Sequence, residues 1–220
     1  MSIRHIGFRA LAACCFAALV LCFEALGLGA GSSARAQQRL PTIPPAQYDE
    51  IQKKAADEFL AARKTPVFGP FEPLMHSPQV MSSARAMGDY LRYNSAVGVT
   101  LSELAILVVA RNWSQDYEWF VHAPISLKQG IKPEIVAAIA DGRRPEAMSE
   151  DEAIVYDFAT ELQNNRRVSD VTYARAQTRF GDKGVVDLTA ILGYYTLLAM
   201  ELNVARYAPP ESAKPLPRFP

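Results

Sequence analysis

The stretch from Leu101 to Asn112 constrains the fold most, because it is apolar around nearly its whole circumference. Residues 104–110 (Leu-Ala-Ile-Leu-Val-Val-Ala) contain no polar side chain. Thr100 and Glu103 precede this run with the Thr-x-x-Glu spacing of a capping box, which favours a helix over a buried strand. A helix that is apolar all round must be enclosed by other parts of the chain. We therefore predict a helix at 101–112 in the centre of the fold.

Apolar residues at helical spacing predict further helices on both sides of the central one. They are expected at residues 48–63, 79–93, 114–128, 133–141, 149–164, 169–180 and 185–206. Ser149 and Glu152 form a second capping box, and Pro124 is expected to end or bend its helix. The Pro-rich stretch 65–78 is predicted to be a loop with one short turn at 71–75. Because no strand pattern, repeat or domain linker is found, we predict a single-domain, all-α bundle of seven or eight helices.

The N-terminus has the order of a secretory signal peptide. Arg4 and Arg9 give it a positive start, residues 10–23 are uncharged and apolar, and Ala34-Arg35-Ala36 ends it with small residues. We expect cleavage after Ala36 and a periplasmic or secreted protein that has no membrane contact once residues 1–36 are removed. The alternative is a retained membrane anchor, although the apolar run is shorter than the roughly 20 residues of a spanning helix.

All three cysteines lie inside this segment, at positions 14, 15 and 22. Cleavage would therefore leave a chain without disulfides, thiolate ligands or cysteine nucleophiles. It would also leave only two histidines, His76 and His122, and a net charge of −2. No basic stripe or acidic tail is present, so we expect no nucleic-acid partner.

The stretch from Arg111 to His122 combines acid–base and aromatic side chains. Glu118 and His122 are four residues apart, so on a helix they lie on one face and can meet. The aromatic residues beside them are Trp113, Tyr117, Trp119 and Phe120. A general acid–base pair beside apolar walls is typical of a site for a small molecule. The alternative is a helix that packs its aromatic residues into the core and carries one structural polar pair.

Several of these pieces resemble the carboxymuconolactone decarboxylase family, which also contains the alkylhydroperoxidase D-like proteins. The resemblance covers residues 68–202 and rests on Glu103–Ala110, Tyr117-Glu118-Trp119-x-x-His122, Gly130 and Gly193-Tyr194-Tyr195. It implies an all-helical subunit of the alkylhydroperoxidase D-like type that assembles into homo-oligomers, either trimers or hexamers. The site is then expected between helices, near a subunit interface. The implied divisions are a Pro-rich leader with the first helix at 37–67, the family-like domain at 68–205 and a Pro-rich arm at 206–220.

The redox branch of this family has a glutamate, two cysteines around a histidine, and a second histidine. On this chain these positions fall on Glu103, Gln115, Tyr117, Glu118 and His122. Reduction of peroxide by that branch requires one thiolate to attack and a second thiol to resolve. Gln115 and Glu118 can do neither, so a peroxidase or antioxidant activity is chemically doubtful for this chain.

The decarboxylase branch uses no cofactor and moves protons on a lactone acid. By this resemblance His122 is the expected proton donor, Glu118 orients it, and Glu103 is a second catalytic carboxylate unless it serves only as a helix cap. Candidate residues for binding the substrate or its oxyanion are Tyr117, Gln115, Arg111 and Trp119. Arg111 alternatively forms a surface salt bridge, and Trp119 alternatively belongs to the core.

The sequence is therefore compatible with three functions. The first is a cofactor-independent lyase or isomerase acting on a small lactone or oxo acid. The second is a metal site on Glu118 and His122, which would need Glu103 as a third ligand; our reading expects no metal. The third is a non-catalytic, oligomeric protein that binds a small molecule.

Overall fold

The computed structural model describes residues 37–218, and this range contains eight α-helices, one 3-10 helix at Pro45–Gln47 and no strand. The α-helices are α1 (Glu50–Arg63), α2 (Phe71–Leu74), α3 (Pro78–Tyr93), α4 (Val99–Asn112), α5 (Asp116–Lys128), α6 (Pro133–Ala140), α7 (Glu150–Asn165) and α8 (Asp170–Ala205). The prediction of an all-α chain of seven or eight helices is confirmed. The predicted signal peptide lies outside the described residues.

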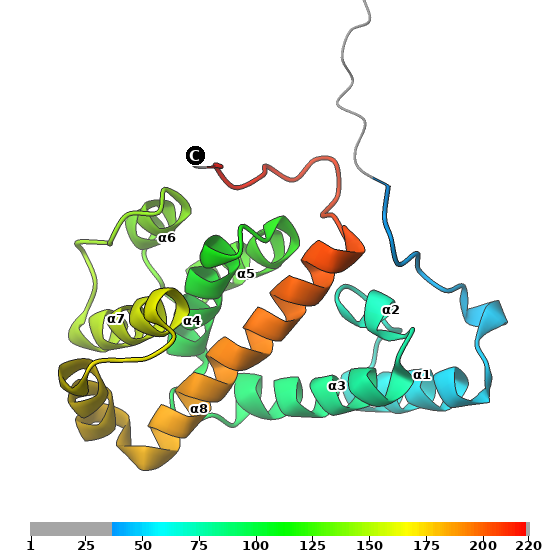
Figure 1. The fold of residues 1–220 in the computed structure, drawn as a ribbon, viewed down its shortest axis with the longest axis horizontal. Coiled ribbons are helices and arrows are strands. Elements are labelled where there is room, and N and C mark those ends of the chain that lie inside the picture. The colour runs from blue at the N-terminus through cyan, green and yellow to red at the C-terminus, as the bar shows by residue number, and fades with distance from the viewer. Residues whose placement is uncertain (1–36, 219–220) are drawn as a thin grey trace, which may run out of the picture. The chain divides into compact units, whose positions relative to one another are not determined.

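Helix α4 lies in the centre, with α5, α7 and α8 packed against it (Figure 1). Every residue from Ser102 to Ala110 is buried. Burial of apolar surface on all sides of the helix accounts for the unbroken apolar run at 104–110, since each face meets a different neighbour. The predicted central helix is therefore confirmed.

The capping box predicted at the start of α4 is wrong. The helix begins two residues earlier than expected, at Val99 after Gly98, and no side chain caps it. Glu103 is consequently too far along the helix to reach back to the N-cap, and its side chain is buried instead. The hydroxyl of Thr100 donates to the carbonyl of Gln129, at 3.1 Å. Glu103 thus needs an explanation other than capping.

Helix α8 is bent at Gly181, where φ of 67° and ψ of 178° are not helical. Two helices are expected in this region, at residues 169–180 and 185–206, and the bend at Gly181 confirms that the helix is interrupted between them. The second part begins close behind the bend rather than at Val185 and runs past α4 toward the C-terminus (Figure 1). Among the described helices only α8 is long and apolar enough to span a membrane, and half of that stretch is buried within the fold, as in a core helix.

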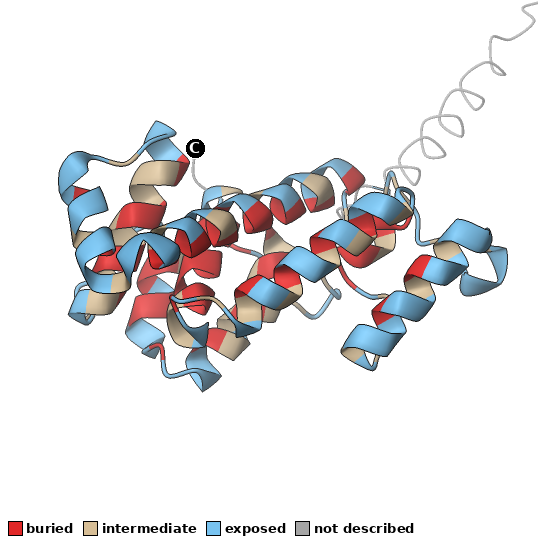
Figure 2. Cartoon of the chain, turned by 90° about the horizontal axis from the view of Figure 1, so that it is seen from below, coloured by how far each residue is buried: buried red, intermediate tan, exposed pale blue. Residues whose placement is uncertain are grey.

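Helices α1 and α3 pack on each other at one side of the bundle. Figure 2 shows that α1 is exposed along most of its length, and only Ala55 and Phe59 of this helix are buried. The Pro-rich stretch 65–78 contains α2, which packs on α3 and α8. The end of α1 and the loop that follows it therefore lie next to α8.

Short sequence motifs predict where two of the helices begin or end, and the structure tests both predictions. The capping box predicted for α7 is present, with the side chain of Ser149 bonded to the backbone of Glu152 and the reverse. Pro124 was expected to end or bend its helix, but α5 continues to Lys128. The missing N–H frees only the carbonyl four residues earlier, at Phe120, and that residue is exposed, so water can satisfy the carbonyl.

Candidate active site

His122 and Glu103 face each other across the contact between α5 and α4. Nδ1 of His122 lies 2.6 Å from Oε2 of Glu103, and both residues are buried. A carboxylate can only accept a hydrogen bond, so Nδ1 carries the proton and donates it to Glu103. The second ring nitrogen, Nε2, is then left with its lone pair and can take up a proton.

Arg92, in the last turn of α3, extends this pair. One of its terminal nitrogens lies 3.6 Å from Oε1 of Glu103. The guanidinium places positive charge beside the carboxyl group of Glu103. Three helices therefore contribute one residue each to a short polar chain inside an apolar bundle.

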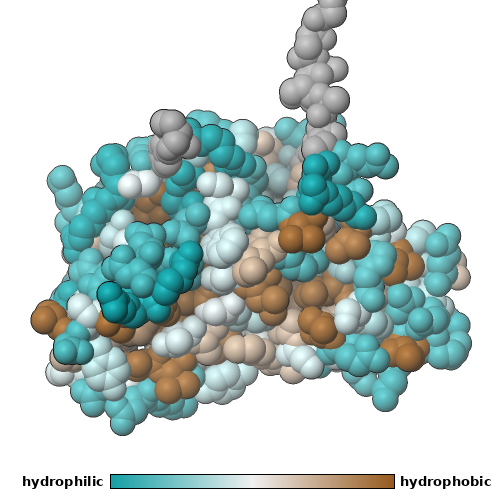
Figure 3. Space-filling view, in the orientation of Figure 1, coloured by the Kyte–Doolittle hydropathy of each residue, from teal (hydrophilic) through white to brown (hydrophobic). Residues whose placement is uncertain are grey.

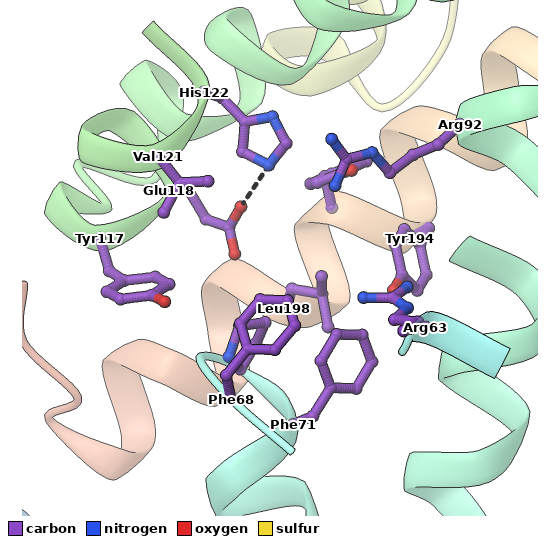
Figure 4. A pocket seen from close by; sticks show the side chains of 12 residues that line it. Arg63, Phe68, Phe71, Arg92, Tyr117, Glu118, Val121, His122, Tyr194 and Leu198 are labelled. Atoms are coloured by element: carbon purple, nitrogen blue, oxygen red, sulfur yellow. Dashed lines mark ion pairs between the residues drawn. The ribbon is translucent and has the colours of Figure 1, made fainter. Parts of the chain in front are cut away.

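Glu118 lies on the other side of the imidazole. Its Oε2 is 3.4 Å from Nε2 of His122 (Figure 4). Burial raises the pKa of Glu118, and the nearby charges of His122 and Arg92 offset this only in part. Its Oε1 is buried and has no hydrogen-bond partner within the described residues. Glu118 is thus a carboxyl group that tends to keep its proton and can exchange it with His122.

A pocket opens next to His122 and Glu118. Figure 4 shows the side chains that form it, which come from α1, the loop before α2, α2 itself, α3, α5 and α8. The lining residues are Arg63, Phe68, Pro70, Phe71, Arg92, Tyr117, Glu118, Val121, His122, Tyr194, Tyr195 and Leu198. Its free space is about 40 Å³, which is room for a water molecule or one small functional group. The arrangement therefore suits a reacting group rather than a large ligand.

Two tyrosines of α8 close the pocket behind the imidazole. The ring of Tyr195 meets that of His122 edge to face, with centroids 5.2 Å apart, and it meets Tyr194 in the same way at 5.1 Å. Burial raises the pKa of Tyr195 well above its ordinary value, and burial also raises the pKa of Tyr194. Both phenols are consequently neutral hydrogen-bond donors at any ordinary pH.

Tyr117 forms the opposite wall of the pocket. Burial raises its pKa to about 12, so it too is a neutral donor. Its ring stacks edge to face on Tyr207, with centroids 5.1 Å apart. Gly69 lies against its hydroxyl: a Cβ at this position would lie 2.6 Å from the Tyr117 oxygen. Close approach of the loop to Tyr117 therefore depends on glycine.

The structure brings together four of the seven predicted site residues: His122, Glu118, Glu103 and Tyr117. The expected roles of the two glutamates are exchanged. Glu103, and not Glu118, accepts the hydrogen bond from Nδ1 that orients the imidazole.

The other three predicted residues do not line the pocket. Gln115 caps α5 by accepting from the backbone N–H of Tyr117 and donates to Asn203. Arg111 donates to the carbonyl of Pro217, and Trp119 packs against the core. The prediction that these residues bind the substrate is therefore not supported by their positions.

Arg63 and Arg92 are not among the predicted site residues, and Tyr194 and Tyr195 had no predicted role. The two tyrosines belong to Gly193-Tyr194-Tyr195, one of the motifs that carry the family resemblance, and this motif could have indicated that they lie at the site. The arginines had no such signal, because a basic residue in the last turn of a helix is ordinarily explained by the helix dipole.

A metal site is not favoured by this geometry. Glu103 and Glu118 contact opposite nitrogens of the same imidazole, so they cannot share one ion with it. Within residues 37–218 no three histidine, aspartate, glutamate or cysteine side chains are placed to hold a metal.

A further carboxyl group, Glu201 of α8, lies near the site. Both of its oxygens are buried and have no hydrogen-bond partner in the described part of the chain. Burial, followed by the charge of Glu118, raises its pKa to about 8. Glu201 therefore holds a proton at neutral pH.

Comparison with known proteins gives a fold but no sequence family. No family model matches the sequence, and no curated protein matches it. Among solved structures, one similar chain is the alkylhydroperoxidase AhpD core of an uncharacterized peroxidase-related protein from Ralstonia eutropha JMP134. The TM-score is 0.64 at 16% identity, over 79% of this chain and 93% of that one. The chain has the AhpD-core fold.

A second similar solved structure is an uncharacterized peroxidase-related protein from Silicibacter sp. TM1040. Its TM-score is also 0.64, at 13% identity, and the match covers 80% of this chain and 92% of that one. Both matches include most of the length of the solved chains. The expectation of an alkylhydroperoxidase D-like bundle is thereby confirmed at the level of the fold.

Proposed function

We propose that the protein is a cofactor-independent lyase or isomerase that moves protons on a small lactone or oxo acid, as in the carboxymuconolactone decarboxylase branch. The observation that carries the proposal is the buried chain from Glu103 through His122 to Glu118, whose outer end meets the pocket. Such a chain supplies a base, an acid and a group that balances their charge, which is what proton transfer beside a carbonyl requires.

In the proposed isomerisation, Nε2 of His122 removes a proton from the carbon next to the substrate carbonyl. The electron pair of the broken C–H bond moves into the carbonyl and forms an enolate. Glu103 balances the charge of the imidazolium that results. Return of the proton from the imidazolium or from Glu118 to a different carbon gives the isomer.

A decarboxylation would use the same groups. The bond from the carbon skeleton to the leaving carboxylate breaks, CO2 departs, and the electron pair forms the enolate. The Glu118 carboxyl then protonates the carbon, directly or through Nε2 of His122, and regains its proton from solvent. In either reaction the neutral phenols of Tyr194 and Tyr195 are suited to stabilise the enolate oxygen as hydrogen-bond donors.

The test is proton chemistry on a panel of lactones, β-oxo acids and carboxymuconolactone, with CO2 release and deuterium uptake from D2O as readouts. We expect turnover by the wild type and its loss in His122→Ala and His122→Gln. His76→Ala is the matched control, since His76 is exposed and contacts the carbonyl of Pro41 away from the pocket. Equal turnover in the wild type and both His122 variants would overturn the proposal.

The second candidate is a protein that binds a small molecule without converting it. It is favoured by the small pocket combined with the absence of cysteine at the positions of the redox branch. This candidate predicts a ligand that binds equally well to the wild type and to His122→Gln, with no turnover by either. Thiol-dependent peroxide reduction is disfavoured, because the corresponding positions hold Gln115 and Glu118.

We also propose export, with cleavage after Ala36 and a periplasmic or secreted product. The order of charged, apolar and small residues in 1–36 supports it. N-terminal sequencing of the protein from a cell fraction enriched in exported proteins would give Gln37 as the first residue. Recovery of the uncut chain in the membrane fraction would instead support the anchor.

A homo-oligomer, trimer or hexamer, is the proposed state in solution. Apolar side chains lie over α8 on the face shown in Figure 3, and Leu197, Met200 and Val204 are 44%, 46% and 60% exposed. They follow one another at helical spacing, so they form one stripe. Sedimentation velocity would give a single species larger than a monomer, and Met200→Glu would shift it toward the monomer.

A further inference from the structure

Two arginines line the pocket on the side opposite Tyr117 (Figure 4). We propose that Arg63 and Arg92 together bind a carboxylate that the substrate keeps throughout the reaction. The inference rests on the proposed function, because it names the class of substrate for the same pocket. That class is a small oxo acid or lactone acid whose bound carboxylate is not the group that leaves.

Arg92 has donors that its surroundings leave unused. Its side chain is only 25% exposed, and its sole ion pair is the 3.6 Å contact to Glu103, which is too long for a hydrogen bond. It donates no hydrogen bond to any residue of the described chain. A guanidinium has five N–H donors in a planar fork that fits a carboxylate. The side chain is therefore suited to an anionic ligand.

Arg63 is held in place by groups other than its terminal nitrogens. Its Nε donates to Asp89 at 2.9 Å, and its guanidinium lies over the ring of Phe71, 4.4 Å from the centroid. Its side chain is 15% exposed. The two terminal nitrogens donate no hydrogen bond within residues 37–218. Arg63 is thus oriented in advance, and its terminal nitrogens can contact a ligand at the pocket.

The charges around the two arginines do not balance. Three guanidiniums, of Arg63, Arg85 and Arg92, face two carboxylates, of Asp89 and Glu103. Glu118 adds no negative charge when it keeps its proton. One positive charge remains, so an anion would be attracted to this side of the pocket.

Two connected spaces suggest that the substrate's carboxylate and its reacting carbonyl bind at different depths. An open groove of about 560 Å³ lies between the end of α1 and the end of α3, and it shares Arg63, Phe68 and Arg92 with the inner pocket of about 40 Å³. The arginines therefore stand at the boundary between the two spaces. A ligand bound there by its carboxylate would direct a carbonyl inward, to His122 and Glu118, and leave any larger part in the groove.

This position determines which carboxylate can be lost. Loss of CO2 neutralises the carboxylate that leaves, and two cations in contact with that carboxylate stabilise the ground state against the reaction. The bound carboxylate is accordingly a handle for orientation. The reaction is either a proton shift in a monocarboxylate or decarboxylation of a second carboxylate in a dicarboxylate.

The experiment measures binding separately from turnover. Levulinate carries a carboxylate at one end and a ketone at the other, and its methyl ester is the uncharged counterpart. Titration calorimetry with the purified protein should show binding of levulinate and at least tenfold weaker binding of the ester. We expect Arg92→Gln and Arg63→Gln each to weaken levulinate binding by roughly tenfold or more. Arg92→Lys should recover only part of the loss, because it lacks the planar fork.

Arg85→Gln is the control, since it removes the same charge nearby from a side chain that does not line the pocket. It should change binding by less than about twofold if direct contact matters more than charge alone. Melting temperatures of all variants check that they are folded. Unchanged levulinate binding in folded Arg92→Gln and Arg63→Gln, or equal binding of the methyl ester, would overturn the proposal.

His122→Gln separates this inference from the proposed function. It should still bind levulinate, because the arginines remain, while deuterium uptake into levulinate is lost. Binding that depends on the arginines without uptake by the wild type would retain the anion site and reject the enzyme. Deuterium uptake that depends on His122 but not on the arginines would retain the enzyme and reject the anion site.

Discussion

Glu103 and His122 form a buried hydrogen bond of 2.6 Å that determines which ring nitrogen faces the pocket. The two residues come from α4 and α5, and the contact holds only because these helices pack closely. It leaves Nε2 toward Glu118 and the substrate. The carboxylate that orients the base is thus on the central helix, while the carboxyl group that exchanges protons is on the helix of the base itself.

Glu103→Gln should disturb catalysis more than structure. An amide can donate as well as accept, so it no longer enforces a proton on Nδ1, and it cannot balance an imidazolium. We expect kcat to fall by roughly 10² to 10⁴. The ring nitrogen shifts of His122 in ¹⁵N NMR would report the changed tautomer. Glu103→Asp, which keeps the charge, should retain more activity; equal losses in both variants would argue against a charge-balancing role.

Glu118→Gln should remove one limb of the pH profile. Burial raises the pKa of Glu118, so the group keeps its proton above the ordinary range of a carboxyl and loses it only as the pH rises further. If its proton is used, wild-type kcat falls as the pH rises through this raised value. The variant should be slower and flat over that range. Asp116→Asn, on the same helix but bonded to Arg218, should keep the wild-type profile.

Glu201→Gln should stabilise the protein at alkaline pH. The pKa of Glu201 is raised from 4.5 to about 8 in the folded chain, so ionisation is easier in the unfolded chain. Its contribution to stability is therefore fully present below pH 4.5 and is lost as the pH rises through about 8. At pH 9 the variant should exceed the wild type by about 2 kcal/mol in urea unfolding, allowing for partial solvent screening.

Glu134→Gln serves as the control for Glu201, because Glu134 is exposed on α6. The difference between the wild type and Glu201→Gln should vanish near pH 4. A constant difference at all pH values would show that packing, and not ionisation, separates the two proteins.

Gly69→Ala should damage the pocket wall at Tyr117. The new Cβ would lie 2.6 Å from the Tyr117 oxygen, and the backbone φ of +59° disfavours a side chain. Gly98→Ala isolates the effect of the backbone conformation, since Gly98 has a φ of +83° but a Cβ there would meet nothing within 4 Å. We expect about 1 kcal/mol of destabilisation for Gly98→Ala and a larger loss, with weaker ligand binding, for Gly69→Ala. Equal losses in the two variants would contradict a role for the contact with Tyr117.

The parts of the fold that follow from local pattern could be predicted from the sequence. The apolar run at 104–110 indicated the central helix, and the spacing of Glu118 and His122 indicated their contact, because both depend on the geometry of one helix. The break at Gly181 was predictable for the same reason. These features do not require knowledge of how helices pack.

The remainder of the site depends on packing between distant segments. Glu103 meets His122 only because α4 and α5 pack together, and its position three residues after Thr100 left a helix cap as the alternative to a catalytic role. Arg63 and Arg92 meet at the pocket although they belong to α1 and α3. Arg111 was predicted to bind the substrate, yet its side chain donates to the carbonyl of Pro217.

The pocket is built from two groups of segments that are separate in the sequence. The proton-transfer groups are attached to α4 and α5 in the interior, whereas the end of α1, the loop at 68–71 and the end of α3 supply the arginines and the outer wall. A change in that second group can alter which acid is accepted without moving the imidazole. Proteins with this fold could therefore diversify their substrates by replacing one peripheral helix pair while the chemistry stays the same.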